Sequence, residues 1–159
     1  MTIPIRIGSC NHQVAPSIGL MDEATRVSRT VDTELSPDEL WALLTDGERW
    51  ATWMVDQADV TVTPGAGGSV VDDGVERTVR IDRLEEDGES HRVAFTWWPD
   101  DRPDLVSSVE LVVLPAVTGS RLHVTETYAT ASAARAAVGR LTWDVRLLLL
   151  AAQALAVLV

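Results

Sequence analysis

The chain has 159 residues, 46% of them hydrophobic, and carries 24 acidic against 13 basic side chains, which gives a formal net charge of -11. This length suits one globular domain, which buries about 68–70% of its unfolded surface without disulfides or a metal. The single cysteine, Cys10, excludes a disulfide framework and a cysteine-rich zinc site. The acidic excess argues against nucleic acid and anionic membranes as partners, because both attract clustered cations.

Residues 1–25 show neither helical nor strand periodicity, so we expect a loosely ordered leader, with Met21 as an alternative translation start. No signal peptide is expected, because Pro4 and Pro16 interrupt this segment and it lacks a continuous apolar core. The apolar run 147–159 is shorter than the roughly 20 residues that span a bilayer. A cytoplasmic location without a membrane partner is therefore expected.

The predicted domain covers residues 26–159 and begins with a strand, because apolar side chains alternate over residues 27–35. Ser36 is a natural N-cap and Glu39 follows three residues later, which completes a capping box before a short helix. Asp46 and Gly47 end this helix, and a second short helix is expected to follow.

Further strand-like segments come next at hairpin spacing, separated by turns rich in glycine and aspartate. They cover residues 58–62, 70–71, 75–84, 91–98, 106–114 and 121–128. Antiparallel hairpins without βαβ crossovers indicate an α+β domain.

The segment 131–159 is rich in alanine and leucine and has the period of a long helix. One apolar stripe is predicted to be buried against a concave sheet; it consists of Val138, Leu141, Val145, Leu148, Ala152 and Leu155. Leu147 and Leu150 lie off this stripe, so the end of the helix is apolar nearly all round. The apolar surface that remains is expected either to contact a second copy of the chain in a homodimer or to be covered by the leader or the short helices.

A family resemblance rests on the order and spacing of several motifs. They are SPDELWALLTDGERWATWM (36–54), PGAGGSVVDDG (64–74), FTWWP (95–99), PAVTGSRLHVTET (115–127) and Trp143. Over residues 27–158 the chain resembles the SRPBCC superfamily, which includes the START domains. Within it, the chain is most similar to bacterial domains related to the C-terminal domain of the activator of the ninety-kilodalton heat-shock chaperone's ATPase.

The resemblance implies a helix-grip fold with a ligand cavity. In this fold a curved antiparallel sheet of about seven strands holds a long C-terminal helix in its concave face, with two short helices after the first strand. The superfamily includes lipid carriers, aromatic polyketide cyclases and hormone receptors, so it implies no single activity. A co-chaperone role does not carry over, because nothing before Val27 resembles the separate N-terminal domain on which that activation relies.

Two charged residues occupy apolar strand registers. Parity places Arg77 and Glu126 on the faces that their strands bury, and Tyr128 shares the face of Glu126. Because an isolated buried charge is costly, one hypothesis makes both residues polar anchors for a ligand that carries a hydroxyl, carbonyl or acid. The alternative is that both lie near open strand ends, solvated or paired with each other.

Aromatic side chains are the candidates for the apolar wall of the cavity. Trp53, Met54, Trp97 and Trp143 are predicted to line it, and the alternative is that they simply fill the core. The three histidines are too scattered for a metal site, and no cofactor is expected.

The function predicted from these features is binding of a small apolar or amphipathic molecule, without assigned catalysis. One alternative is a polyketide cyclase or dehydratase in which Glu126 is a general acid or base. Another is a protein-interaction or regulatory module.

Overall fold

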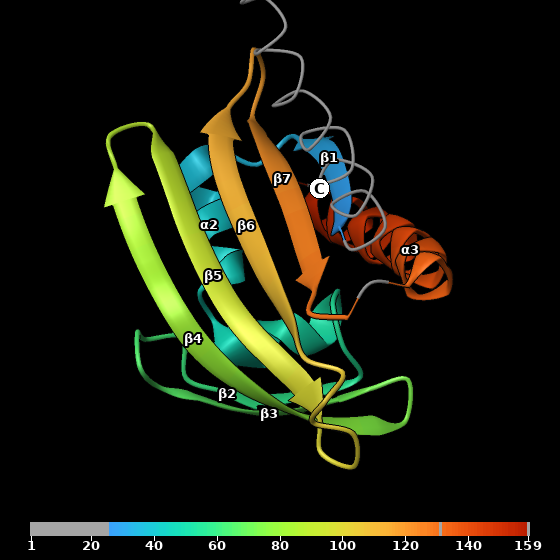
Figure 1. The fold of residues 1–159 in the computed structure, drawn as a ribbon. Helices are drawn as coiled ribbons and strands as arrows, with labels where there is room; N and C mark the ends of the chain where they lie inside the picture. The colour runs from blue at the N-terminus through green and yellow to red at the C-terminus, as the bar shows by residue number, and fades with distance from the viewer. Residues whose placement is uncertain (1–25, 131, 159) are drawn as a thin grey trace, which may run out of the picture.

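The computed structural model describes residues 26–130 and 132–158, so the predicted leader and the alternative start at Met21 lie outside the described residues. Seven antiparallel strands form one sheet in the order β1-β7-β6-β5-β4-β3-β2 (Figure 1). The elements are β1 (Arg26–Thr33), α2 (Pro37–Leu44), η1 (Gly47–Thr52), β2 (Gln57–Val60), β3 (Gly67–Asp72), β4 (Val75–Asp87), β5 (Ser90–Pro99), β6 (Ser107–Pro115), β7 (Ser120–Tyr128) and α3 (Ala133–Leu158). The expected α+β helix-grip architecture is confirmed.

The first short helix starts where the sequence predicts, whereas the second begins earlier, at Gly47, which was expected to end the first, and stops before Trp53. In the capping box of α2, the Glu39 backbone N–H donates to the Ser36 hydroxyl at 3.1 Å and the Ser36 N–H donates to the Glu39 carboxylate at 2.9 Å. The second helix, η1, is a 3-10 helix capped by Asp46, whose carboxylate accepts from the Glu48 N–H at 3.2 Å. Gly47 allows close packing, because a Cβ there would overlap the Val60 carbonyl group.

One face of the sheet is apolar and packs against the helices, and the other face is polar. The register between β4 and β5 shifts between Ile81 and Arg83, so the inward positions of β4 pass from Val79 and Ile81 to Leu84. Ion pairs such as Arg121 with Asp32 and Arg83 with Glu110 cover the outer face. The core side chains of the strands include Val27, Val79, Ile81, Val93, Phe95, Trp97, Val109, Leu111, Val113, Leu122 and Val124.

The prediction for the long helix was wrong about which side is buried. The predicted stripe faces solvent: Val138, Leu141, Val145 and Leu148 are 63%, 68%, 56% and 70% exposed. We call these four residues the outer stripe. Ala152 is also exposed, and the side chain of Leu155 lies outside the described part of the chain.

The buried side of α3 consists instead of Ala136, Trp143, Leu147 and Leu150. Leu147 and Leu150, which were expected to be free for a partner, are therefore core residues. The helix packs on β1 and η1, beside the sheet edge that β1 forms (Figure 1), and this packing turns Trp143 inward. Apolar periodicity alone cannot distinguish these faces when both carry large side chains. In the described part of the chain, no helix is both long and apolar enough to cross a membrane.

Candidate functional site

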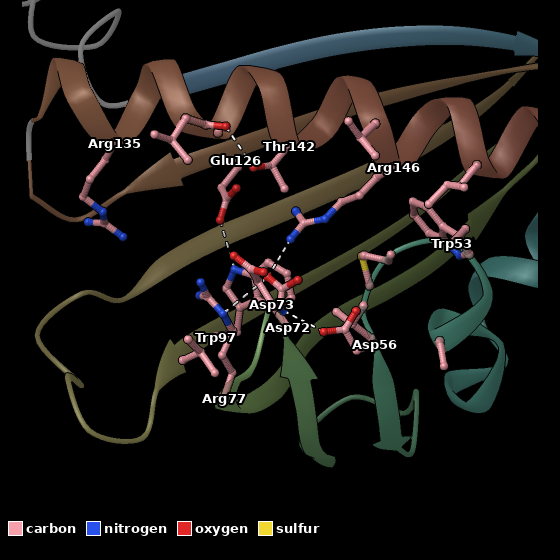
Figure 2. A pocket seen from close by; sticks show the side chains of 18 of the residues that line it. Trp53, Asp56, Asp72, Asp73, Arg77, Trp97, Glu126, Arg135, Thr142 and Arg146 are labelled. Atoms are coloured by element: carbon pink, nitrogen blue, oxygen red, sulfur yellow. Dashed lines mark hydrogen bonds and ion pairs between the residues drawn. The ribbon is translucent and has the colours of Figure 1, made fainter.

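A pocket of about 880 Å³ lies between the sheet and α3 (Figure 2). Trp97 from β5, Glu126 and Tyr128 from β7, and the β3–β4 hairpin contribute to its lining, together with one side of α3. The segment after η1, from Trp53 to Asp56, completes it. The fold therefore leaves a cavity where the resemblance implied one.

Glu126 is the hub of a buried hydrogen-bond network. Its side chain is held by four donors although the residue is only 4% exposed. Oε2 accepts from Trp97 Nε1 at 3.0 Å and from Ser107 Oγ at 2.6 Å. Oε1 accepts from Trp143 Nε1 at 2.8 Å and from the Tyr128 hydroxyl at 3.2 Å. Because a carboxylate offers about four acceptor sites, protein donors replace water around it completely.

Tyr128 connects this network to the backbone of α3. Burial, followed by the charge of Glu126, raises the pKa of the Tyr128 phenol, so the hydroxyl stays protonated and donates. The hydroxyl lies against Gly139, where a Cβ would overlap it. On the ring face, the guanidinium carbon of Arg135 lies 4.5 Å from the ring centroid. Gly139 thus sets how closely the helix approaches β7.

A second polar cluster joins the hairpin to α3. Asp72 Oδ2 accepts from Arg146 Nη2 at 2.7 Å and lies 3.6 Å from Arg77 Nε. Burial raises the pKa of Asp72, against the effect of the two guanidinium groups, and burial lowers the pKa of Arg146, against the effect of Asp72. The Arg146 guanidinium carbon lies 4.6 Å from the Trp143 ring centroid, and that of Arg77 lies 5.0 Å from the Trp97 centroid. Cations and indoles therefore stack in layers along the pocket wall.

The side of α3 that lines the pocket carries polar as well as apolar residues. Arg135, Gly139, Thr142 and Arg146 follow one another at intervals of four, three and four residues, which puts them on one side of the helix. We call these four residues the inner line. Arg135 Nη2 donates to the Leu105 carbonyl at 3.2 Å, whereas its buried Nη1 has no hydrogen-bond partner among the described residues. The inner line thus faces the pocket, whereas the outer stripe is mostly exposed, although Val138 and Val145 also belong to the pocket lining.

His91 and His123, the two histidines among the described residues, have structural surroundings. His91 packs against Trp41 with 5.1 Å between the ring centroids, and its Nε2 lies 3.6 Å from Asp38 Oδ1. His123 forms a hydrogen bond of 2.8 Å with Thr30 between β7 and β1. Within residues 26–130 and 132–158, no three histidine, cysteine, aspartate or glutamate side chains gather as a metal ligand set.

The comparison with family models gives a match over most of the chain. Residues 24–154 match the family described as polyketide cyclase/dehydrase and lipid transport. The chain belongs to this family. Its place in the SRPBCC superfamily, predicted from the motifs, is thereby confirmed. The finer likeness to the chaperone-activator domain stays a prediction. A search of curated proteins gives no match.

Solved structures share the fold of this polyketide cyclase/dehydrase family member at low sequence identity. A Rhodobacter sphaeroides protein is 22% identical, with a TM-score of 0.66 over 84% of this chain and 94% of the other. CalU16 from Micromonospora echinospora is 22% identical, with a TM-score of 0.61 over 79% of this chain and 73% of the CalU16 chain. DynU16, from the dynemicin biosynthetic locus, is 22% identical, with a TM-score of 0.65 over 80% of this chain. The match spans only 46% of the DynU16 chain.

Most of the site residues predicted from the sequence lie together at the pocket. Six of them line it: Trp53, Met54, Arg77, Trp97, Glu126 and Tyr128. Trp143 is fully buried and reaches the network through its bond to Glu126. Glu126 is neither solvated nor paired with Arg77, because its partners are the four donors above and Arg77 approaches Asp72.

Sequence reasoning missed Asp72, Arg135 and Arg146. Asp72 reads as part of an acidic turn, and its link to Arg146 joins residues 74 positions apart, which no local pattern predicts. The inner line did leave a signal. Its spacing places small and polar residues along one side of an otherwise apolar helix, as expected where a helix borders a polar cavity.

Proposed function

We propose that this protein binds a small apolar or amphipathic molecule in the pocket between the sheet and α3. The pocket itself carries the proposal: it has a volume of about 880 Å³ and combines indole walls with two polar clusters. Ligand sites of this kind typically have about 300–1,000 Å³, mostly apolar walls and a few convergent polar groups. No catalytic step is assigned.

The filled acceptor sites of Glu126 favour binding over the cyclase or dehydratase alternative. A general base must present a free lone pair to the substrate, and here all four acceptor positions hold protein donors. The alternative therefore requires one donor to leave first. An interaction module draws support from the outer stripe. Homodimer formation and a cytoplasmic location stay predictions.

The test is native mass spectrometry of protein purified from its own host, with a matched pair of variants. Thr142→Trp adds an indole on the inner line, where it fills the pocket, and Leu141→Trp adds the same group at the next residue, which faces solvent. We expect the wild type and Leu141→Trp to retain a small-molecule adduct and Thr142→Trp to lose it. An adduct retained equally by all three proteins would place the ligand elsewhere and refute the proposal.

A further inference from the structure

Three arginines converge on the pocket of a protein that is strongly acidic overall. The chain has 13 basic against 24 acidic side chains, yet Arg77, Arg135 and Arg146 all line this one cavity. Arg77 comes from β4, and the other two are the ends of the inner line of α3. Positive side chains gathered in a partly buried cleft favour an anionic ligand, because low-dielectric walls strengthen their field.

The two carboxylates inside the pocket, Glu126 and the partly buried Asp72, leave two of these guanidinium groups, Arg77 and Arg135, without an acidic hydrogen-bond partner. Asp72 is shared between Arg146 and Arg77, with Arg77 at the longer distance of 3.6 Å. Glu126 already accepts four other donors. Arg135 reaches only a backbone carbonyl within hydrogen-bond distance, that of Leu105. The interior of the pocket therefore has three guanidinium groups for two carboxylates, the buried Glu126 and the partly buried Asp72.

Two further acids line the pocket, but both are exposed. The carboxylate of Asp56 accepts a hydrogen bond of 2.9 Å from the backbone N–H of Asp73 in the β3–β4 hairpin turn. Asp104, outside the pocket lining, also interacts electrostatically with Arg135, but it is exposed and paired with Arg102. Water and salt screen such exposed charges, so these acids balance Arg135 poorly. The excess of positive charge belongs to the buried part of the pocket.

The wall also has unused donors. Arg77 Nε and Arg135 Nη1 are buried nitrogens without a hydrogen-bond partner in the described structure. Figure 2 shows the two side chains at the same end of the pocket, Arg135 reaching in from α3 and Arg77 from β4, with Trp53 at the other end. An unpaired buried donor is costly, and a ligand that supplies acceptors removes this cost.

We propose that the ligand presents a carboxylate to Arg77 and Arg135, with its apolar body toward Trp53 and Met54. This inference rests on the proposed binding function and adds the chemical class of the ligand. The planar fork of a guanidinium matches the two oxygens of a carboxylate, and the charge strengthens each hydrogen bond. A bound carboxylate also neutralises the third guanidinium group of the pocket interior.

The experiment compares acids with their neutral amides. Naphthoic acid and naphthamide, and decanoic acid and decanamide, are titrated at neutral pH by isothermal calorimetry. We expect the wild type to bind each acid about tenfold or more tightly than its amide. Arg77→Gln and Arg135→Gln should lose this preference and keep the amide affinity, whereas Arg135→Lys should retain part of the preference. Arg140→Gln is the control, because Arg140 is an exposed arginine of the same helix.

The possible results separate this inference from the proposed function. Equal affinity of the wild type for acid and amide refutes the carboxylate while leaving the pocket a binding site. Failure of both classes to bind, in protein freed of any retained ligand, counts against the binding function itself. If either glutamine variant loses amide binding as well, its arginine maintains the shape of the pocket, and the carboxylate role is overturned.

Discussion

Replacing Gly139 by alanine places a methyl group where the hydroxyl of Tyr128 lies. Alanine gains about 1 kcal/mol of helix propensity over glycine. Against this, overpacking costs about 1–3 kcal/mol, and the hydroxyl can move aside only by weakening its bond to Glu126, a charged hydrogen bond that contributes about 1.5–3 kcal/mol. We therefore expect Gly139→Ala to lower the free energy of unfolding by about 1–3 kcal/mol, measured by urea denaturation with tryptophan fluorescence.

The matched background is Tyr128→Phe, which removes the overlapping oxygen. The added Cβ then meets the ring carbon Cζ at 3.2 Å and Val27 Cγ2 at 3.3 Å, close contacts that small shifts can relieve. In this background Gly139→Ala should be neutral or stabilise the fold by up to about 1 kcal/mol. The double-mutant cycle isolates this coupling. Equal destabilisation in both backgrounds would show that the hydroxyl does not set the approach of α3 to β7.

Three further predictions concern the network and the orientation of α3. Glu126→Gln should lower the free energy of unfolding by about 2–4 kcal/mol, because the N–H₂ group of the new glutamine faces hydrogen-bond donors. In the same urea assay, Glu110→Gln on the outer face should lower it by no more than about 1 kcal/mol. Tyr128 is the single tyrosine of the chain, and its pKa is raised in the folded protein. Tyrosinate absorbance should therefore be absent from the native protein at pH 10.0, where the tyrosine of the unfolded chain is half ionised, and the free energy of unfolding should fall as pH rises past that value. Native absorbance that titrates like that of the unfolded chain would contradict this. Leu148 is exposed and Leu150 is buried, so Leu148→Ala should change the free energy of unfolding by less than about 0.5 kcal/mol, whereas Leu150→Ala should lower it by about 2–5 kcal/mol. The reverse ranking in thermal or urea unfolding would contradict the orientation of α3.

Strand parity was sufficient to place the inward side chains of the sheet at the site, although the register shift after Ile81 breaks the alternation further along β4. Alternation with a period of two assigns Arg77, Trp97 and Glu126 to the buried face once their apolar neighbours mark that face. The capping box similarly fixed the start of α2 from four residues. These predictions succeeded because each depends on contacts within one short segment.

The partners of these residues could not be predicted in the same way. The bond from Trp143 to Glu126 and that from Arg146 to Asp72 depend on the rotation of α3 about its axis. Periodicity marked the outer stripe as the more apolar side, and the rule that apolar sides turn inward then gave the wrong rotation. The rule fails here because two polar groups of α3 find partners inside: the Arg146 guanidinium bonds Asp72 of the hairpin, and the Trp143 indole bonds Glu126 of the sheet.

The outer stripe of α3 and the pocket share two residues, because Val138 and Val145 are exposed and also belong to the pocket lining. Any molecule that docks on this side of α3 therefore also contacts residues of the pocket lining. If the pocket holds a ligand as proposed, the two binding events are coupled, because thermodynamic reciprocity requires each molecule to change the affinity of the other by the same factor.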